Sequence, residues 1–197
     1  PASPVQHLLL DGLSTPVVVC TSGNVADEPI VTDDADALAR LSGIADAWLT
    51  NDRPIHSACD DSIVRASGTV VVPLRRARGF TPLPVPLAGD GPAVLAMGGD
   101  LKGALCLAVG GQAFMSQHLG DHGQLATYRA ARQAALQLVD LLHTVPAAAA
   151  IDTHPGYLSA RLGRELAGEW GVPVVEVQHH HAHVVSVMAE HGAHAPV

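Results

Sequence analysis

The chain has 197 residues, of which 48% are hydrophobic and 15% are charged. This length and composition predict a folded globular chain of one large or two small domains and exclude intrinsic disorder. The net charge of −8 provides no general basic field for nucleic-acid phosphates, so we expect no nucleic-acid partner. A local basic patch stands at Arg75-Arg76-Ala77-Arg78.

The cysteines and the start of the chain indicate the compartment. Cys20, Cys59 and Cys106 are widely spaced and form no CxxC pair, which argues against a disulfide framework and against a thiolate zinc site. We therefore expect a reducing compartment, the cytoplasm. Residues 1–4 include no initiator methionine, no charged leader and no long apolar run. We therefore expect no signal peptide, no membrane partner and a fragment of a longer protein.

The first 80 residues predict short strands and a helix. The run Pro16–Cys20 is β-branched and predicts a buried strand. Residues 33–42 predict a helix, because acidic residues open it and Gly43 closes it. Residues 47–50 predict a second strand, and residues 68–72 are also β-rich.

Polar groups next to these elements are candidates for anion binding. Thr21-Ser22-Gly23-Asn24 follows the first predicted strand, where hydroxyl, amide and backbone N–H groups can bind an anion or a nucleotide. The same residues also make an ordinary turn, which the local sequence favours. Arg53 and Arg65 flank the adjacent Asp60 and Asp61. These four residues either clamp phosphates and a metal or pair with one another on a solvated rim. The local sequence alone favours ion pairs on a solvated rim.

A stretch rich in proline and glycine divides the chain. Prolines 82, 84, 86 and 92 and glycines 79, 89 and 91 occur at a density that neither a helix nor a sheet interior tolerates. We predict a partly extended linker at residues 81–92, between one domain at residues 1–80 and another at residues 93–197.

The second domain shows an α/β pattern. We predict a strand at 93–97, a tight turn at Gly98-Gly99-Asp100 and a returning strand at 105–109. This turn and Lys102 can approach a phosphate, although a plain hairpin tip is the more common case. Strands at 147–152 and 173–177 then alternate with helices at 124–142, at 157–170 and from the histidines to Glu190. The alternation predicts parallel pairing with right-handed crossovers and a site at the carboxyl ends of the strands, the edge where His154 and His179 would lie.

Four histidines stand in five positions within Gln178-His179-His180-His181-Ala182-His183. On a helix, His179 and His183 share a face, at the spacing by which two imidazoles bind one metal ion. The alternative is a histidine-rich surface turn. A zinc protease is excluded, because His180 occupies the place of the glutamate that would act as general base.

These segments together resemble the HypF family, the carbamoyltransferases of nickel–iron hydrogenase maturation. In the second half, the resemblance rests on 97–102, 113–121, 154–159 and 177–183. In the first half, it rests on 21–24, 28–30, 51–55, 60–65 and 75–79, which are similar to the YrdC-like domain of that family. Each motif is weak alone, but together they follow the order of the family across a linker in the expected place.

The resemblance implies an α/β fold class: part of a YrdC-like domain, followed by part of an actin/Hsp70-like (ribonuclease H-like) domain. It also implies a two-stage reaction. Carbamate released from carbamoyl phosphate is joined to ATP, which gives carbamoyl-adenylate and pyrophosphate. The carbamoyl group then passes to the C-terminal cysteine of the HypE protein.

The resemblance also implies site residues and cofactors. His179 and His183 would bind a divalent metal, zinc or iron, with a third ligand outside this chain, and Mg²⁺ would accompany ATP. Catalytic residues stay unassigned. The residues expected to bind the nucleotide are Ser22, Asn24, Arg53, Asp61, Ser62, Arg65, Asp100 and Lys102.

The chain also departs from the family pattern. The acylphosphatase-like domain, the cysteine-rich zinc region and the second half of the ATPase-like domain are not in this sequence. Gly103 stands where the family usually has asparagine, and Gly156 where it usually has an acidic residue. We therefore expect that this chain alone does not complete the transfer.

Three other functions are alternatives. The first is carbamoylation of a small molecule, as in antibiotic O-carbamoyltransferases, but their domains follow the reverse order. The second is a threonylcarbamoyl-adenylate system for tRNA, against which the acidic balance argues. The third is a non-catalytic module that binds a metal or a nucleotide and docks a partner.

Overall fold

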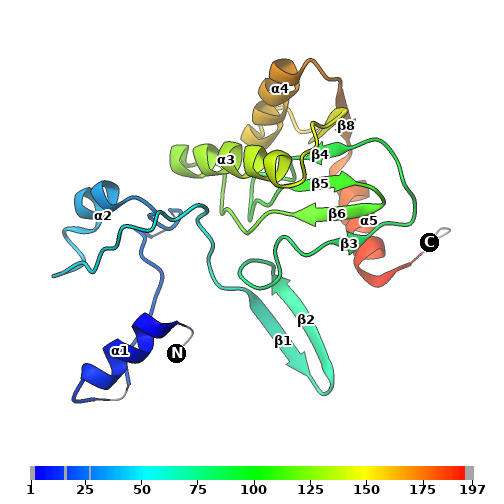
Figure 1. The fold of residues 1–197 in the computed structure, drawn as a ribbon. Coiled ribbons are helices and arrows are strands. Elements are labelled where there is room, and N and C mark those ends of the chain that lie inside the picture. The colour runs from blue at the N-terminus through cyan, green and yellow to red at the C-terminus, as the bar shows by residue number, and fades with distance from the viewer. Residues whose placement is uncertain (1–2, 16, 27, 194–197) are drawn as a thin grey trace.

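The computed structural model describes residues 3–15, 17–26 and 28–193. Their N-terminal part holds helices α1 (Pro4–Gly12) and α2 (Asp34–Leu41) and the antiparallel hairpin of β1 (Ile63–Ser67) and β2 (Val70–Arg75). Figure 1 shows this part in blue and cyan, with long connections between its elements and the hairpin extending away from the second part. Neither helix has a buried residue, so this part has little core of its own.

A six-stranded sheet forms the centre of the second part. Its strands lie in the order β3-β6-β5-β4-β7-β8. Strand β4 pairs antiparallel with β5 and parallel with β7, and β7 pairs parallel with β8. The bounds are β3 (Val85–Pro86), β4 (Val94–Ala96), β5 (Cys106–Val109), β6 (Gln112–Met115), β7 (Ala148–Asp152) and β8 (Val174–Val177).

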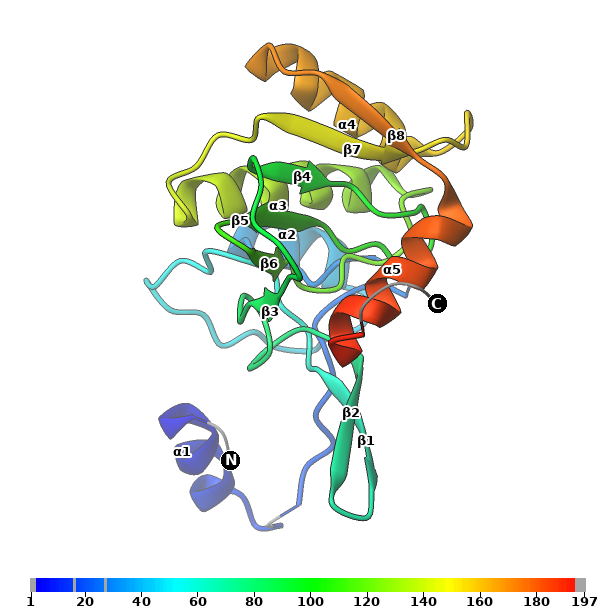
Figure 2. The same cartoon turned by 90° about the vertical axis from the view of Figure 1, so that its right-hand side faces the viewer.

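Three helices accompany this sheet. Helices α3 (Leu125–Leu141) and α4 (Leu158–Trp170) lie against one face, and α5 (His179–His191) lies on the other side (Figure 2). The core lies between the sheet and the first two helices. It contains fully buried Leu95, Met97 and Leu107 from the strand side and Leu162 and Leu166 from α4. The apolar repeat of α3 places small alanines on its buried face, which lets the helix approach the sheet closely.

The structure confirms most elements predicted for the second part. The hairpin of β4 and β5, the strands β7 and β8 and the helices α3, α4 and α5 lie where the patterns place them. Gly171 ends α4 with a φ of 69°, a left-handed conformation that glycine adopts without steric cost. In the N-terminal part, α2 confirms the helix predicted at 33–42, and the Asp33 side chain accepts a hydrogen bond from the Asp36 N–H.

Two predicted strands are wrong. Residues 17–20 form no strand, and Val19 is 98% exposed, whereas Pro16 lies outside the described residues. Residues 47–50 also form no strand. A strand needs a neighbour that satisfies its backbone groups, and within the described part of the chain neither run pairs with one.

Part of the predicted linker at residues 81–92 forms an edge strand of the sheet. Its residues Val85–Pro86 form β3, which pairs with β6 at the edge of the sheet. Proline is tolerated there because an edge strand leaves one row of N–H groups unpaired. Strand β6 was not predicted, although Gly110 and Gly111, both with positive φ, form the tight turn that leads into it.

The cysteines of this chain form no disulfide bond among the described residues. Cys20, Cys59 and Cys106 are all free thiols. Burial raises the pKa of the Cys106 thiol to about 11, so this thiol stays protonated at neutral pH. Among the described residues, the helices are too short or too polar to cross a membrane.

Candidate functional site

The carboxyl ends of β7 and β8 bring together the side chains of the candidate site. Asp152 is the last residue of β7, and β8 ends one residue before Gln178, which caps α5. The Gln178 side chain accepts a hydrogen bond from the His181 N–H at 2.9 Å, so the helix begins at His179. The carboxyl ends of β7 and β8 therefore lie at one edge of the sheet, and His154 and His179 are both close to it.

Asp152 holds His179 in a defined orientation. Its Oδ2 lies 2.5 Å from His179 Nδ1, and its Oδ1 accepts the His154 N–H at 2.8 Å. The Asp152 side chain is only 7% exposed. Burial favours a higher pKa for this carboxyl group, but the hydrogen bonds from His179 and His154 and their charges lower it overall. Asp152 is therefore ionised at neutral pH and accepts a hydrogen bond from the Nδ1–H group of His179.

The second nitrogen of His179 faces His183. The two Nε2 atoms are 3.1 Å apart, and the ring centroids are 4.7 Å apart. Because Asp152 binds the Nδ1–H, the lone pair of neutral His179 lies on Nε2, the form that binds metals. One ion at the usual zinc–nitrogen distance of about 2.0–2.1 Å reaches two nitrogens with this separation. The pair therefore fits a metal. In the described ranges no group of three or more His, Cys, Asp or Glu side chains is arranged to hold a metal.

Aromatic rings pack beside this pair. His154 stacks on Tyr157 with centroids 4.2 Å apart, and Tyr157 meets His179 edge to face at 6.1 Å. His154 Nδ1 accepts the Gly156 N–H at 3.2 Å. A Cβ atom at Gly99 would lie 3.6 Å from His179 Cε1, so the hairpin turn also adjoins the site.

Asp100 and Lys102 lie in that hairpin turn. The carboxylate of Asp100 accepts the N–H groups of Leu158 and Ser159 at 2.9 and 2.8 Å, and thereby caps α4. Lys102 is exposed, has a φ of 52°, and donates its backbone N–H to Asp121 at 2.7 Å. Their expected nucleotide contacts remain a prediction, but Asp100 has a structural task as well.

The glycine at position 103 has a local explanation. A Cβ atom there would lie 2.2 Å from Cε1 of His122, whose side chain is fully buried. The His122 ring thus fills the space that a larger residue at 103 would need.

The nucleotide contacts expected of six residues in the N-terminal part remain a prediction. Ser22, Arg53 and Arg65 are exposed, and Asn24 donates its amide to the carbonyl groups of Val25 and Glu28. Ser62 Oγ donates to the Arg78 carbonyl and accepts the Ala77 N–H.

The two aspartates of the predicted rim pair with other arginines than expected. Asp60 lies 3.4 Å from Arg75, and Asp61 lies 3.6 Å from Arg78. Arg53 and Arg65 take no part in these pairs.

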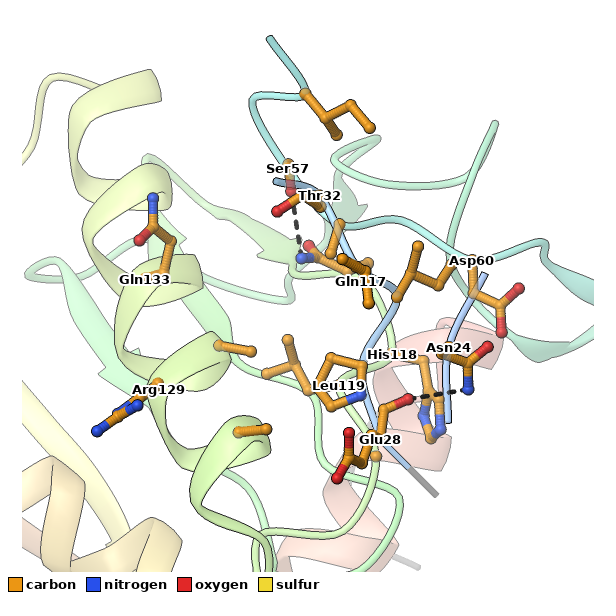
Figure 3. Close-up of a pocket in the computed structure, with 18 of the residues that line it drawn as sticks. Asn24, Glu28, Thr32, Ser57, Asp60, Gln117, His118, Leu119, Arg129 and Gln133 are labelled. Atoms are coloured by element: carbon orange, nitrogen blue, oxygen red, sulfur yellow. Dashed lines mark hydrogen bonds between the residues drawn. The ribbon is translucent and has the colours of Figure 1, made fainter. Parts of the chain in front are cut away.

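A cavity of about 530 Å³ lies between the two parts of the chain. Figure 3 shows residues of the N-terminal loops on one side and α3 with the segment after β6 on the other. The Gln117 side chain donates to Ser57 Oγ at 3.3 Å across it. Burial, aided by the positive charge of Arg75, lowers the pKa of His118, which is therefore a neutral imidazole at pH 7. Of the eight predicted nucleotide-binding residues, Asn24 lines this cavity.

Sequence reasoning missed Asp152, Gln117 and His118. A signal existed for Asp152, because an aspartate that ends a predicted parallel strand faces the site edge. Gln117 and His118 lie in the segment 113–121 that resembles the family, but only the packing of the two parts places them at the cavity.

Asp152→Asn is expected to weaken metal binding by about 10–100-fold, as loss of an outer-shell partner usually does. The amide has no charge, and its NH₂ group can donate to Nδ1 and thus move the proton of His179 to Nε2. Calorimetric titration with Zn²⁺ measures the change. Asp140→Asn is the control, because it makes the same charge change on the exposed face of α3. Equal affinities of the two variants would contradict the orienting role.

Comparisons with protein families cover both parts of the chain. The model of the HypF Kae1-like domain matches residues 89–190. The model of the Sua5, YciO and YrdC family, described as telomere recombination, matches residues 1–77.

Curated relatives and solved structures agree with these matches. Carbamoyltransferase HypF2 of Cupriavidus necator is 47% identical over 212 residues, covering 100% of this chain and 26% of the relative. Carbamoyltransferase HypF of Synechocystis is 44% identical over 191 residues, covering 96% and 24%. The crystal structure of full-length HypF in the phosphate- and nucleotide-bound form superposes with a TM-score of 0.89 at 37% identity, over 100% of this chain and 26% of that one. For HypF of T. kodakarensis, the TM-score is 0.81 at 34% identity, over 88% and 23%.

The chain thus spans about a quarter of the length of the curated relatives it matches. Both parts match the same proteins in the same order. The chain belongs to the HypF family of carbamoyltransferases.

Proposed function

We propose that this chain is part of a carbamoyltransferase that makes carbamoyl-adenylate from carbamoyl phosphate and ATP and transfers the carbamoyl group to the C-terminal cysteine of HypE. The observation that carries the proposal is the pair of Nε2 atoms 3.1 Å apart, oriented by Asp152 at the carboxyl edge of the sheet, in a chain of this family. The proposed compartment is the cytoplasm, where a cysteine acceptor stays reduced.

The first stage would belong to the N-terminal part. Water first cleaves carbamoyl phosphate into carbamate and inorganic phosphate. A carbamate oxygen then attacks the α-phosphorus of ATP, and pyrophosphate leaves; Mg²⁺ would accompany the nucleotide. Guanidinium and hydroxyl groups stabilise phosphate oxygens, and Arg53, Arg65 and Ser22 are the proposed donors, because both amide N–H groups of Asn24 already donate to backbone carbonyls. Arg53 and Arg65 are exposed, and within the described residues neither forms a side-chain ion pair, so both guanidinium groups are available.

The cavity between the two parts suits the product of this stage. Carbamoyl-adenylate is hydrolysed readily, so a path that excludes bulk water protects it. The cavity is bounded by Asn24 on the N-terminal side and by Gln117 and His118 on the side of the sheet. Their amide and imidazole groups can hydrogen-bond a nucleotide without adding charge.

The second stage would occur at the carboxyl edge of β7 and β8. The cysteine sulfur attacks the carbamoyl carbon, and AMP leaves. His179 and His183 would hold a divalent metal, zinc or iron, which when bound supplies Lewis acidity toward a carbonyl or phosphoryl oxygen. Asp152 keeps His179 in its binding tautomer, and Tyr157 packs against the ring.

The test replaces the matching segment of Cupriavidus necator HypF2 by this chain. With ATP, carbamoyl phosphate and HypE, the chimera is expected to add one carbamoyl group to the terminal cysteine, measured by mass spectrometry. The chimera that carries His179→Ala and His183→Ala is expected to add none. An inactive parent chimera that folds and binds metal would favour a non-catalytic module, and transfer to a small alcohol in place of HypE would favour an O-carbamoyltransferase.

The isolated chain is expected to leave HypE unmodified under the same conditions. Its matches cover about a quarter of the relatives, and the histidine pair lacks further ligands among the described residues. Carbamoylated HypE after incubation with the isolated chain would overturn this expectation.

A further inference from the structure

Helix α5 carries His179 and His183, the two histidines proposed to bind a metal, yet few apolar contacts hold it in place. None of its residues is buried, and Val184, Val185 and Val187 are each at least 45% exposed. Most helices in proteins are stabilised by burying an apolar face, and here that contribution is small. Within the described residues, polar contacts with other elements therefore contribute to the position of α5.

Such contacts lie at its two ends. At the N-terminal end, His179 bonds to Asp152 and packs against Tyr157. At the C-terminal end, the Glu190 carboxylate accepts a hydrogen bond from Arg76 Nη2 at 2.6 Å. Figure 2 shows α5 running from the end of β8 down to the top of the β1–β2 hairpin, where this second contact forms.

The helix by itself disfavours Glu190. A carboxylate in the last turn faces the negative end of the helix dipole, where a cation would be favoured. The Arg76 guanidinium supplies the compensating positive charge. Both side chains are partly shielded from water, with 23% of Arg76 and 39% of Glu190 exposed.

Arg76 also contacts the second part of the chain through its backbone. It directly follows β2, and its carbonyl accepts the His118 N–H at 3.2 Å. Its guanidinium carbon lies 6.0 Å from the centre of the Phe80 ring, and its neighbour Ala77 is fully buried. Arg76 is therefore well placed to transmit the position of the hairpin to α5.

We propose that Arg76 is a positioning residue, which through Glu190 couples the N-terminal part of the chain to the helix that presents His179 and His183. The contact between Arg76 and Glu190 exists without a metal. Only its expected effect on metal binding rests on the proposed function. Through this contact, a movement of the β1–β2 hairpin changes the position of α5.

The test is a charge-swap cycle on the full chain. Arg76→Glu and Glu190→Arg each place like charges together. Each is expected to speed hydrogen exchange of the α5 amides and to weaken Zn²⁺ binding about two- to fivefold, the range for partly exposed ion pairs. The double variant restores an opposite pair and is expected to return both quantities toward the parent values. Arg76→Lys, which keeps the charge, is expected to have a smaller effect than Arg76→Glu.

Arg161→Glu is the matched control, because it makes the same charge change on an ion pair confined to α4. It is expected to leave exchange in α5 unchanged. The proposal is overturned if the two single effects simply add in the double variant, or if neither single variant alters α5 exchange. A third outcome is that no variant binds Zn²⁺, but hydrogen exchange in α5 rises in the single variants and recovers in the double variant. This result would support the coupling and contradict only the metal function.

Discussion

Replacing both His179 and His183 by alanine is expected to abolish metal binding by this chain. The loss should exceed the factor of about 10–100 that removal of an outer-shell partner costs, because the ligand atoms themselves disappear. Elemental analysis of the purified parent is expected to find near-stoichiometric metal, and that of the double variant none. Titration with Zn²⁺ then measures the remaining affinity.

The neighbouring histidines supply the control. His180→Ala with His181→Ala removes two imidazoles from the same helix but leaves the 3.1 Å pair intact. His180 Nδ1 lies 2.9 Å from the Gln178 side chain and is not part of that pair. We expect this variant to keep its metal. If both double variants lose it equally, the cluster binds metal without a defined site. If the parent itself binds none, the metal-pair hypothesis is contradicted for the isolated chain.

Gly163→Ala is expected to destabilise the chain by about 1–3 kcal/mol, the usual cost of overpacking a core. The new Cβ would lie 2.5 Å from Ile151 Cγ2 and 2.7 Å from Met97 Cγ. Both neighbours are buried, and Ile151 is β-branched and therefore stiff at χ1. They also precede Asp152 and the Gly98-Gly99-Asp100 turn, so a shift at this point disturbs the site edge.

Gly168→Ala in the same helix is the matched control with the opposite sign. No atom lies within 4 Å of the Cβ position at Gly168, and the residue is exposed. Alanine should therefore stabilise α4 by up to about 1 kcal/mol through helix propensity alone. Urea unfolding followed by circular dichroism measures both variants. Stabilisation by Gly163→Ala would show that the core at this position is looser than the distances indicate.

The sequence predicted the second part of the chain far better than the first. The long apolar repeat of α3 and the alternation of β7, α4, β8 and α5 are local patterns, and the structure confirms them. The two strands predicted at 16–20 and 47–50 depended on β propensity alone. Propensity describes how well a residue suits a sheet, but a strand forms only when another strand satisfies its backbone.

The histidine pair shows the same difference between what local patterns predict and what only tertiary contacts decide. The spacing of four residues was enough to place His179 and His183 on one helical face. It could not identify Asp152, which is 27 residues from His179 and meets it only because β7 and β8 pair in parallel.

By itself, the sequence determined the order of elements in the second part, the resemblance to the HypF family and the placement of His179 and His183 on one helical face. These features follow from residue periodicity, turn chemistry and motif order, which are local along the chain. The tertiary structure alone decided that the linker provides an edge strand, that Asp152 orients His179, that Asn24 and His118 share a cavity and that Arg76 reaches Glu190. Each of these contacts joins distant residues, and such contacts depend on how strands and helices pack rather than on any local pattern.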